Sequence, residues 1–266
     1  MGIIGAGRFG RAFIEGILKA KIFKKDQIWA AEKNQTAKEM AEKFLGIEIC
    51  EDFSEKISKT DILILAVKPA QISSVLEILR EQNISEKTLM ISVAAGTSVH
   101  KLENGLQKKN PVIRAMPNSP AMVQSGITAI CRGTYATDES FKVAQSIFEA
   151  LGVCVEIEEK YFDLVTALSG SGPAYFYTMI SALIDAGTKG GLTKDQAKQL
   201  ATHTAKGAAE MILKLNREPL DLRNDVATPG GCTVEALKIL DLNSFSQSII
   251  KAVEEATQVA SRLGKN

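Results

Sequence analysis

The feature that most constrains the fold is a glycine-rich turn at the start of the chain. Gly5, Gly7 and Gly10 form a G-x-G-x-x-G pattern between a short apolar strand and an amphipathic helix. In such a unit one glycine makes the tight turn, one lets a pyrophosphate approach the backbone, and one lets the helix pack closely on the strand. Exposed N–H groups and the positive end of the helix attract the phosphates, so the motif predicts a Rossmann dinucleotide site. The predicted phosphate-binding residues are Gly5, Ala6, Gly7, Arg8, Phe9 and Gly10.

The composition is that of a soluble globular protein. Hydrophobic residues make up 45% and charged residues 24% of the 266 residues, which allows one large domain or two ordinary ones. The 32 basic and 31 acidic residues give a net charge of +1, and the chain has no basic stripe with interleaved aromatic residues. We therefore expect neither a nucleic-acid partner nor a membrane partner.

The four cysteines indicate a reducing compartment. They lie far apart, with no C-x-x-C pair, so we expect neither a metal site nor a disulfide framework. The first residues enter a strand directly, without the charged region and cleavable apolar core of a secretory signal. The cytoplasm is therefore the expected location.

Short apolar runs alternate with helical patterns from residue 1 to about residue 158. Residues 62–67 are apolar on both faces, as expected for a central parallel strand. The alternation predicts a doubly wound, mainly parallel sheet covered by helices on both faces. The expected strands are 2–4, 27–31, 61–67, 88–93, 111–115, 126–131 and 153–157, and the expected helices are 8–20, 35–45, 70–81, 99–106 and 138–151, the last capped by Thr137 or Asp138.

The second half of the chain shows only helical patterns, with expected helices at 174–186, 194–215, 233–240 and 244–263. Residues 162–188 carry two charged side chains, but the SGSGP break at 169–173 leaves apolar pieces too short to span a membrane. A helix that is apolar nearly all round needs cover on every side, so we expect a homodimer formed through this half. The predicted domains are 1–158, which binds the dinucleotide, and 159–266, which is all-helical, binds the substrate and dimerises.

Three residues after the second expected strand bear on the choice of cofactor. Glu32 follows Gly10 by 22 residues, where an acid usually accepts hydrogen bonds from the ribose hydroxyls of NAD. Lys33 and Asn34 follow at once and are suited to the 2′-phosphate of NADP. The sequence leaves NADH and NADPH open.

Three further turns follow expected strands and should line the same ligand crevice. Lys68 is a candidate general acid or ribose contact, with a solvated lysine as the alternative. Small residues at the second turn would leave room for a flat ring, and Asn118 is a candidate hydrogen-bonding wall. The candidates from these turns are Ala66, Val67, Lys68, Pro69, Ala94, Ala95 and Asn118.

The sharpest feature of the second half is the segment DVATPGGCTVEALKIL at 225–240. Its two glycines can point successive N–H groups at one spot before a helix, an arrangement suited to a carboxylate, with the hydroxyls of Thr228 and Thr233 alongside. The alternative is an ordinary capped turn with Thr233 as the N-cap. Cys232 is a possible nucleophile, but no histidine partner is identifiable, which favours a space-filling role.

Together these segments resemble pyrroline-5-carboxylate reductases over essentially the whole chain. The shared segments are GAGRFG, AVKPAQ, SVAAG, RAMPNSPAMVQSG, ALSGSGPAYFY and DVATPGGCTVEAL, of which the last is the most specific. The resemblance implies a Rossmann domain, an all-helical dimerisation domain, often a ring of dimers, and reduction of 1-pyrroline-5-carboxylate to L-proline with NADPH or NADH.

The resemblance also assigns roles to residues. Residues 228–233 would hold the substrate carboxylate, and Thr233 would also hydrogen-bond the ring nitrogen and serve as the catalytic residue. Residues 5–10 would hold the pyrophosphate, 32–34 the adenosine ribose, and 66–69 with 94–95 the nicotinamide side. The candidate substrate-binding residues are Thr228, Pro229, Gly230, Gly231, Cys232, Thr233, Ser171 and Glu159.

The sequence departs from the family at Cys232, where relatives often have Ala or Thr, and at Asn216, near a place where some relatives have an acid. Two alternatives remain: a reductase of a related cyclic imino acid, and a protein that senses NAD(P) without turnover. A β-hydroxyacid dehydrogenase is disfavoured, because the comparable helix at 172–188 has no lysine for the catalytic position.

Overall fold

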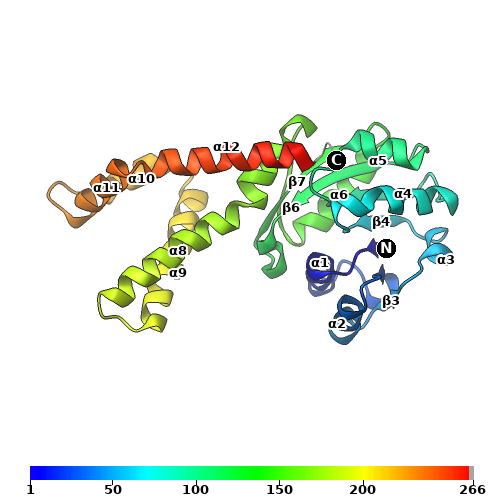
Figure 1. Ribbon diagram of the computed structural model, residues 1–266, viewed down its shortest axis with the longest axis horizontal. Coiled ribbons are helices and arrows are strands. Elements are labelled where there is room, and N and C mark those ends of the chain that lie inside the picture. Colours follow the sequence, from blue (N-terminus) through cyan, green and yellow to red (C-terminus); the bar gives the residue numbers. More distant parts are fainter. Residues whose placement is uncertain (264–266) are drawn as a thin grey trace. The chain divides into compact units, whose positions relative to one another are not determined.

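The computed structural model describes residues 1–263, so the last three residues of the predicted helical domain lie outside the described part. The chain divides into two compact units (Figure 1). The first comprises Met1–Ser171 and the chain from Glu254 onward, and the second comprises Gly172–Val253. The domain boundary at residue 158 follows the change of element type instead, and it stays a prediction.

Eight strands form one sheet in the first unit (Figure 1). Their order is β3-β2-β1-β4-β5-β6-β7-β8; β1 to β6 are parallel, β7 is antiparallel to β6, and β8 is parallel to β7. The predicted doubly wound, mainly parallel sheet is confirmed. The strands are β1 (Gly2–Ile4), β2 (Trp29–Ala31), β3 (Glu48–Cys50), β4 (Ile62–Leu65), β5 (Leu89–Ser92), β6 (Val112–Pro117), β7 (Gly126–Arg132) and β8 (Gly152–Glu156).

Helices cover the two faces of this sheet in two separate apolar layers. The neighbouring residues Ile3 and Ile4 of β1 are both buried but belong to different layers, because successive side chains of a strand point to opposite faces. The layer of Ile3 includes side chains of α1 (Arg8–Lys19), α2 (Gln35–Leu45) and α6 (Asp138–Glu149). The layer of Ile4 includes those of α3 (Ser54–Ile57), α4 (Ile72–Glu81) and α5 (Val99–Leu106).

Side-chain caps fix where several of these helices begin. Thr137 caps α6 by accepting a hydrogen bond from the Ser140 N–H at 3.2 Å, which decides between the two predicted caps. The first segment of this unit, up to Ser171, ends with α7 (Phe162–Val165), which runs into a π-helical turn at Thr166–Gly170.

The second unit consists of helices α8 (Gly172–Lys189), α9 (Lys194–Leu215), α10 (Pro219–Asp225), α11 (Cys232–Leu242) and the first part of α12 (Phe245–Leu263). The sequence did not predict α10, because its seven residues are too short and too polar for a clear helical pattern. Helices α8 and α9 approach closely at Gly187, where an added Cβ would lie 3.0 Å from the Ala197 Cβ. Among the described residues of this unit, only Gly172, Ala197 and Ala201 are buried.

The apolar helix α8 raised the question of a membrane span. Within residues 1–263, no helix combines the length and the hydropathy that crossing a membrane requires.

Candidate active site

The glycine turn has the geometry that a dinucleotide site needs. Gly5 has a φ of +103°, and an added Cβ there would lie 2.6 Å from the Ala66 carbonyl oxygen. At Gly10 an added Cβ would collide with the Gly5 carbonyl oxygen, so this glycine lets α1 pack on the turn. At Gly7 the nearest atom to an added Cβ is a Glu32 carboxylate oxygen at 3.9 Å, which leaves the backbone open to a ligand. The three glycines therefore match the three predicted roles.

A cleft of about 410 Å³ lies beside this turn, where segments following β1, β2 and β4 come together. The strand order reverses between β1 and β4, and ligands of open parallel sheets bind at such a switch point, beyond the carboxyl ends of the strands. Eight predicted cofactor residues line it: Gly5, Gly7, Glu32, Lys33, Asn34, Ala66, Val67 and Lys68.

Two of the predicted cofactor residues are involved in holding the fold. The side chain of Asn34 caps α2 by accepting a hydrogen bond from the Ala37 N–H at 2.9 Å. The side chain of Asn118 accepts one from the Ile127 N–H at 3.0 Å, which ties the turn after β6 to β7. Their predicted cofactor contacts are thus left to their side-chain amide nitrogens.

The other predicted cofactor residues do not line the cleft. Phe9 points into the core and stacks on Phe13, with ring centroids 6.0 Å apart. Ala94 is 4% exposed in the apolar layer of Ile4. The predicted cofactor residues outside the lining are Ala6, Arg8, Phe9, Gly10, Pro69, Ala94, Ala95 and Asn118.

Several residues that line the cleft were not predicted. Glu51 and Phe53 follow the unpredicted strand β3, and Val75 and Ile78 lie on α4. Their apolar or charged side chains form no motif with the glycine turn, since only the folding of β3 and α4 brings them to it.

The predicted carboxylate turn belongs to the second unit and is a tight turn before α11. The Gly231 N–H donates to the Thr228 carbonyl oxygen at 2.9 Å, and Gly230 has a φ of +73°. Pro at the second position and a glycine with positive φ at the third are typical of a type II turn. An added Cβ on Gly231 would lie 2.6 Å from the Thr228 hydroxyl and 3.0 Å from the Thr228 carbonyl oxygen, so a side chain at this position would crowd the turn.

The alternative in which Thr233 caps this helix is wrong. Helix α11 begins at Cys232, its N-cap is Gly231, and no side chain caps it. The first-turn N–H groups of a helix lack intrahelical partners, so this end is left for a ligand or water. Thr233 is half-buried in the first turn, and its hydroxyl forms no hydrogen bond with another described residue. The turn therefore combines free donors, the positive end of a helix and a free hydroxyl.

Glu159, a predicted substrate residue, is paired inside the first unit. Its carboxylate accepts hydrogen bonds from the Val99 N–H at 2.6 Å and from Arg114 Nη1 at 3.0 Å. The side chain of Arg114 is 7% exposed, and its guanidinium lies 4.6 Å from the centre of the Phe162 ring. The structure thus gives Glu159 a structural role, which joins the start of α5 to β6.

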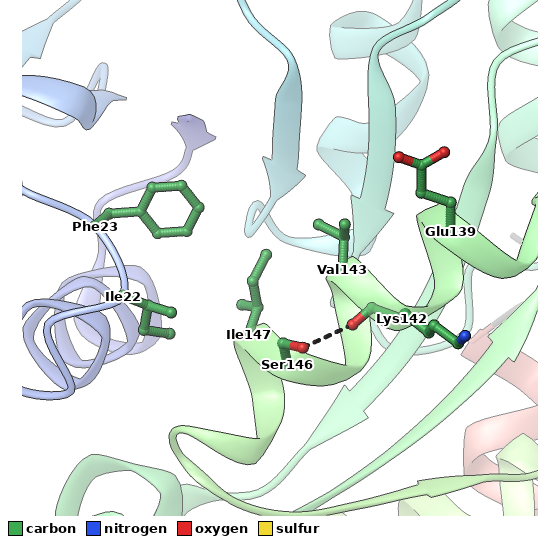
Figure 2. A pocket seen from close by; sticks show the side chains of 7 residues that line it. All are labelled: Ile22, Phe23, Glu139, Lys142, Val143, Ser146 and Ile147. Carbon is green, nitrogen blue, oxygen red and sulfur yellow. Dashed lines mark hydrogen bonds between the residues drawn. The ribbon is translucent and has the colours of Figure 1, made fainter.

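The first unit has a second hollow, of about 460 Å³, away from the glycine turn (Figure 2). It lies between the segment after α1, with Ile22 and Phe23, and one face of α6. Its Ser146 hydroxyl donates to the Lys142 carbonyl oxygen at 2.9 Å within the helix. None of the predicted site residues lines this hollow.

Comparison with known proteins finds relatives that match nearly the whole chain. It is 37% identical to the pyrroline-5-carboxylate reductase of Methanosarcina acetivorans, over 100% of this chain and 98% of the relative. It is 35% identical to pyrroline-5-carboxylate reductase 2 of Homo sapiens, over 96% of this chain and 80% of the relative. The chain belongs to the pyrroline-5-carboxylate reductase family.

Family models and solved structures agree with this assignment and confirm the resemblance and the fold predicted from sequence. A model described as pyrroline-5-carboxylate reductase dimerisation matches residues 159–263, and one described as NADP oxidoreductase, coenzyme F420-dependent, matches residues 1–96. The structure of Plasmodium falciparum pyrroline carboxylate reductase with NADP bound matches with a TM-score of 0.90 at 33% identity, covering 99% of this chain and 97% of that one. A Coxiella burnetii pyrroline-5-carboxylate reductase matches with a TM-score of 0.89 at 32% identity, covering 100% and 98%.

The residues of the first unit fit the nicotinamide dinucleotide that this family implies. The cradle at Gly7 is open to a pyrophosphate, the first turn of α1 adds N–H groups, and the carboxylate of Glu32 lies beside the cradle at the end of β2. Lys68 also lines the cleft, with an exposed side chain that has no ion-pair partner among the described residues.

Proposed function

We propose that this chain reduces 1-pyrroline-5-carboxylate to L-proline with NADH or NADPH, the last step of proline biosynthesis. The observation that carries the proposal is the uncapped start of α11 behind the turn at residues 228–231. A protein that only senses NAD(P) has no need of this anion site. A reductase of a carboxylated imine needs one, and membership of the family supports that choice.

The substrate carboxylate is proposed to accept hydrogen bonds from the N–H groups of Cys232 and Thr233 at the start of α11. The helix end is positive, and an anion at this place is stabilised by typically 0.3–1 kcal/mol, more where water is excluded. The hydroxyl of Thr233 is proposed to hydrogen-bond the ring nitrogen, while Thr228, Pro229, Gly230 and Gly231 set the shape of the turn. Ser171 is kept as a proposed pocket residue, and the structural pairing of Glu159 leaves it a weak candidate.

The reaction asks little acid–base chemistry of the side chains. When bound, the reduced nicotinamide supplies a hydride to the imine carbon. A cyclic imine is already a good hydride acceptor, so the chain's task is to hold the substrate in one orientation and to exclude water. This agrees with a candidate site that offers hydroxyls and backbone N–H groups and has no catalytic histidine among its described residues.

The direct test follows the oxidation of NADH and of NADPH by the purified chain with 1-pyrroline-5-carboxylate, and then with a six-membered cyclic imino acid. We expect turnover with the five-membered substrate and formation of one L-proline per cofactor oxidised. Faster turnover of the six-membered imine would make the chain a reductase of a related imino acid. Binding of the cofactor with no turnover of either would support the sensor instead.

We also propose that the chain forms a homodimer through its second unit, that dimers assemble further into a ring, and that it works in the cytoplasm. The match of residues 159–263 to a dimerisation model and the exposed apolar side chains of α8 to α12 support self-association. The dispersed, unpaired cysteines agree with a reducing compartment.

A further inference from the structure

The cleft has an acid held in a fixed direction where the adenosine ribose of a dinucleotide would lie. The Glu32 N–H donates to the Cys50 carbonyl oxygen at 3.0 Å, which anchors the backbone at the end of β2. One oxygen of the Glu32 carboxylate, Oε1, accepts a hydrogen bond from the Asn34 N–H at 2.9 Å. The other, Oε2, is the atom nearest to the open side of Gly7. The carboxylate therefore faces the phosphate loop with one oxygen free.

The same contacts remove a donor that a 2′-phosphate would need. Phosphates at such turns are held by backbone N–H groups, and the Asn34 N–H is the one directly after Glu32 and Lys33. It is already used by Glu32, and the Asn34 side-chain oxygen is used by the Ala37 N–H. To bind the Asn34 N–H, a 2′-phosphate would have to displace the Glu32 carboxylate from its hydrogen bond.

A nearby lysine is also neutralised. Lys38 Nζ on α2 lies 2.8 Å from the Glu51 carboxylate, and Glu51 itself lines the cleft. The hydrogen bond from Lys38 lowers the pKa of Glu51, and that from Glu51 raises the pKa of Lys38, so both stay charged near neutral pH. Lys33 and Lys68 are the cations that line the cleft, and both side chains are exposed to solvent, which screens their attraction for a phosphate.

We propose that this end of the cleft selects the free 2′-hydroxyl of the adenosine ribose and disfavours a 2′-phosphate, so that the chain prefers NADH to NADPH. The inference rests on the proposed function in that the cleft binds a nicotinamide cofactor. A hydroxyl donates to the free oxygen of Glu32, whereas a phosphate brings a second negative charge to the same place. Arg8 stands at the start of α1, where the phosphates common to both cofactors bind, so its charge does not discriminate between them.

The Plasmodium falciparum structure has NADP bound, at 33% identity to this chain. In this chain the hydrogen bond between Glu32 and the Asn34 N–H, and the pairing of Lys38 with Glu51, favour NADH.

The test measures equilibrium binding of NADH and of NADPH to the purified full chain by calorimetry, without any imine. We expect the Kd of NADH to be at least about 10-fold lower than that of NADPH, a difference of about 1.4 kcal/mol. Glu32→Gln keeps an acceptor for the Asn34 N–H but removes the charge. We expect it to lower the ratio of the NADPH Kd to the NADH Kd by about 10-fold, mainly through tighter NADPH binding. The wild-type preference should also shrink as salt is raised, because salt screens the repulsion.

Two further variants keep the test decisive. Glu51→Gln frees Lys38 and should tighten NADPH binding by about 3-fold with little change for NADH. The control Glu39→Gln changes an exposed acid on α2 that is hydrogen-bonded to Gln35, and should leave both Kd values unchanged. Equal or tighter binding of NADPH by the wild type, or no narrowing in Glu32→Gln, would overturn the inference while leaving the proposed reductase intact. Binding of neither cofactor would instead contradict the proposed function, and the inference with it.

Discussion

At the scale of single residues, Thr233 is the side chain whose removal should affect turnover most. It stands in the first turn of an uncapped helix, and its hydroxyl forms no bond with another described residue, so its loss should not disturb the fold. We expect Thr233→Ala to lower kcat/KM by about 10- to 1000-fold, the ~1.4–4 kcal/mol of a polar contact to a charged or developing site. Steady-state kinetics with 1-pyrroline-5-carboxylate measure this.

The matched variants for this residue are Thr233→Ser, which keeps the hydroxyl, and Thr202→Ala on the exposed surface of α9. The serine variant should retain most of the activity, and Thr202→Ala all of it. An alanine variant at 233 with an unchanged kcat/KM would remove Thr233 from the site.

The cysteines make a second prediction at this scale. Burial raises the pKa of Cys131 to about 12 and that of Cys154 to about 12, whereas Cys232 is exposed in the proposed carboxylate turn. The thiolate is the reactive form, so near pH 8 the thiols of Cys131, which is buried, and Cys154, which is half-buried, stay protonated and unreactive. We expect iodoacetamide to modify Cys232 before Cys131 and Cys154, as followed by mass spectrometry of the native protein.

The control for this labelling is Cys232→Ser, which should abolish the fast reaction, and full denaturation, which should expose all four thiols. Slower labelling of Cys232 in the presence of L-proline would support the carboxylate turn. Equal rates for Cys131 and Cys232 in the native protein would contradict the burial that the structure shows.

At the scale of elements, the contacts of Glu159 with Arg114 and the Val99 N–H join α5, β6 and the 3-10 turn at Glu159–Tyr161. Removing Glu159 leaves a guanidinium that is 7% exposed without its counter-charge and an N–H of α5 without its acceptor. We expect Glu159→Ala to destabilise the first unit by about 2–3 kcal/mol, less than the ~3–5 kcal/mol of a fully buried pair because Glu159 is 35% exposed. Chemical denaturation measures this.

The comparison variant is Glu158→Ala, which removes a surface pair with Lys160 and should change stability by less than about 0.5 kcal/mol. If Glu159 only holds the fold, the kcat/KM of the folded Glu159→Ala protein stays close to that of the wild type. A 10-fold loss of kcat/KM with unchanged stability would restore Glu159 as a substrate residue.

Glu159 also shows where sequence reasoning stops at this scale. The glycine turn and its three roles could be predicted, because Gly5, Gly7 and Gly10 act within one strand–turn–helix unit. The pairing of Glu159 with Arg114 joins residues that are 45 positions apart in the chain, so no local sequence pattern predicts it.

The candidate site shows the same limit. The turn before α11 could be recognised from its glycines and threonines, but the choice between a capped helix and a free one needed the helix start at Cys232. Glu51 escaped notice because β3 is three residues long and its side chains are exposed or half-buried, which leaves no alternation to detect. Its place in the cleft depends on the pairing of β3 with β2.

At the scale of the whole molecule, the second unit has too little buried surface to be stable alone. Its buried residues among those described are one glycine and two alanines, while Leu213 is 81% exposed and Leu242 is 79% exposed. Helices without a core of their own need another surface, and in an obligate dimer the partner supplies it. The stability of the chain should therefore depend on its concentration.

The last prediction tests this dependence with a pair of exposed apolar residues. Leu242→Glu on α11 should weaken self-association at least about 10-fold, because burying a leucine contributes ~1.5–3 kcal/mol and the new carboxylate resists burial. Phe44→Glu, on α2 of the first unit where Phe44 is 62% exposed, should leave association unchanged. Sedimentation velocity over a dilution series gives the dissociation constant of self-association for the wild type and for each variant, and Tm is measured at each concentration. A wild-type chain that sediments as a stable monomer with a constant Tm would show that the apolar faces of the second unit are not covered by a second copy.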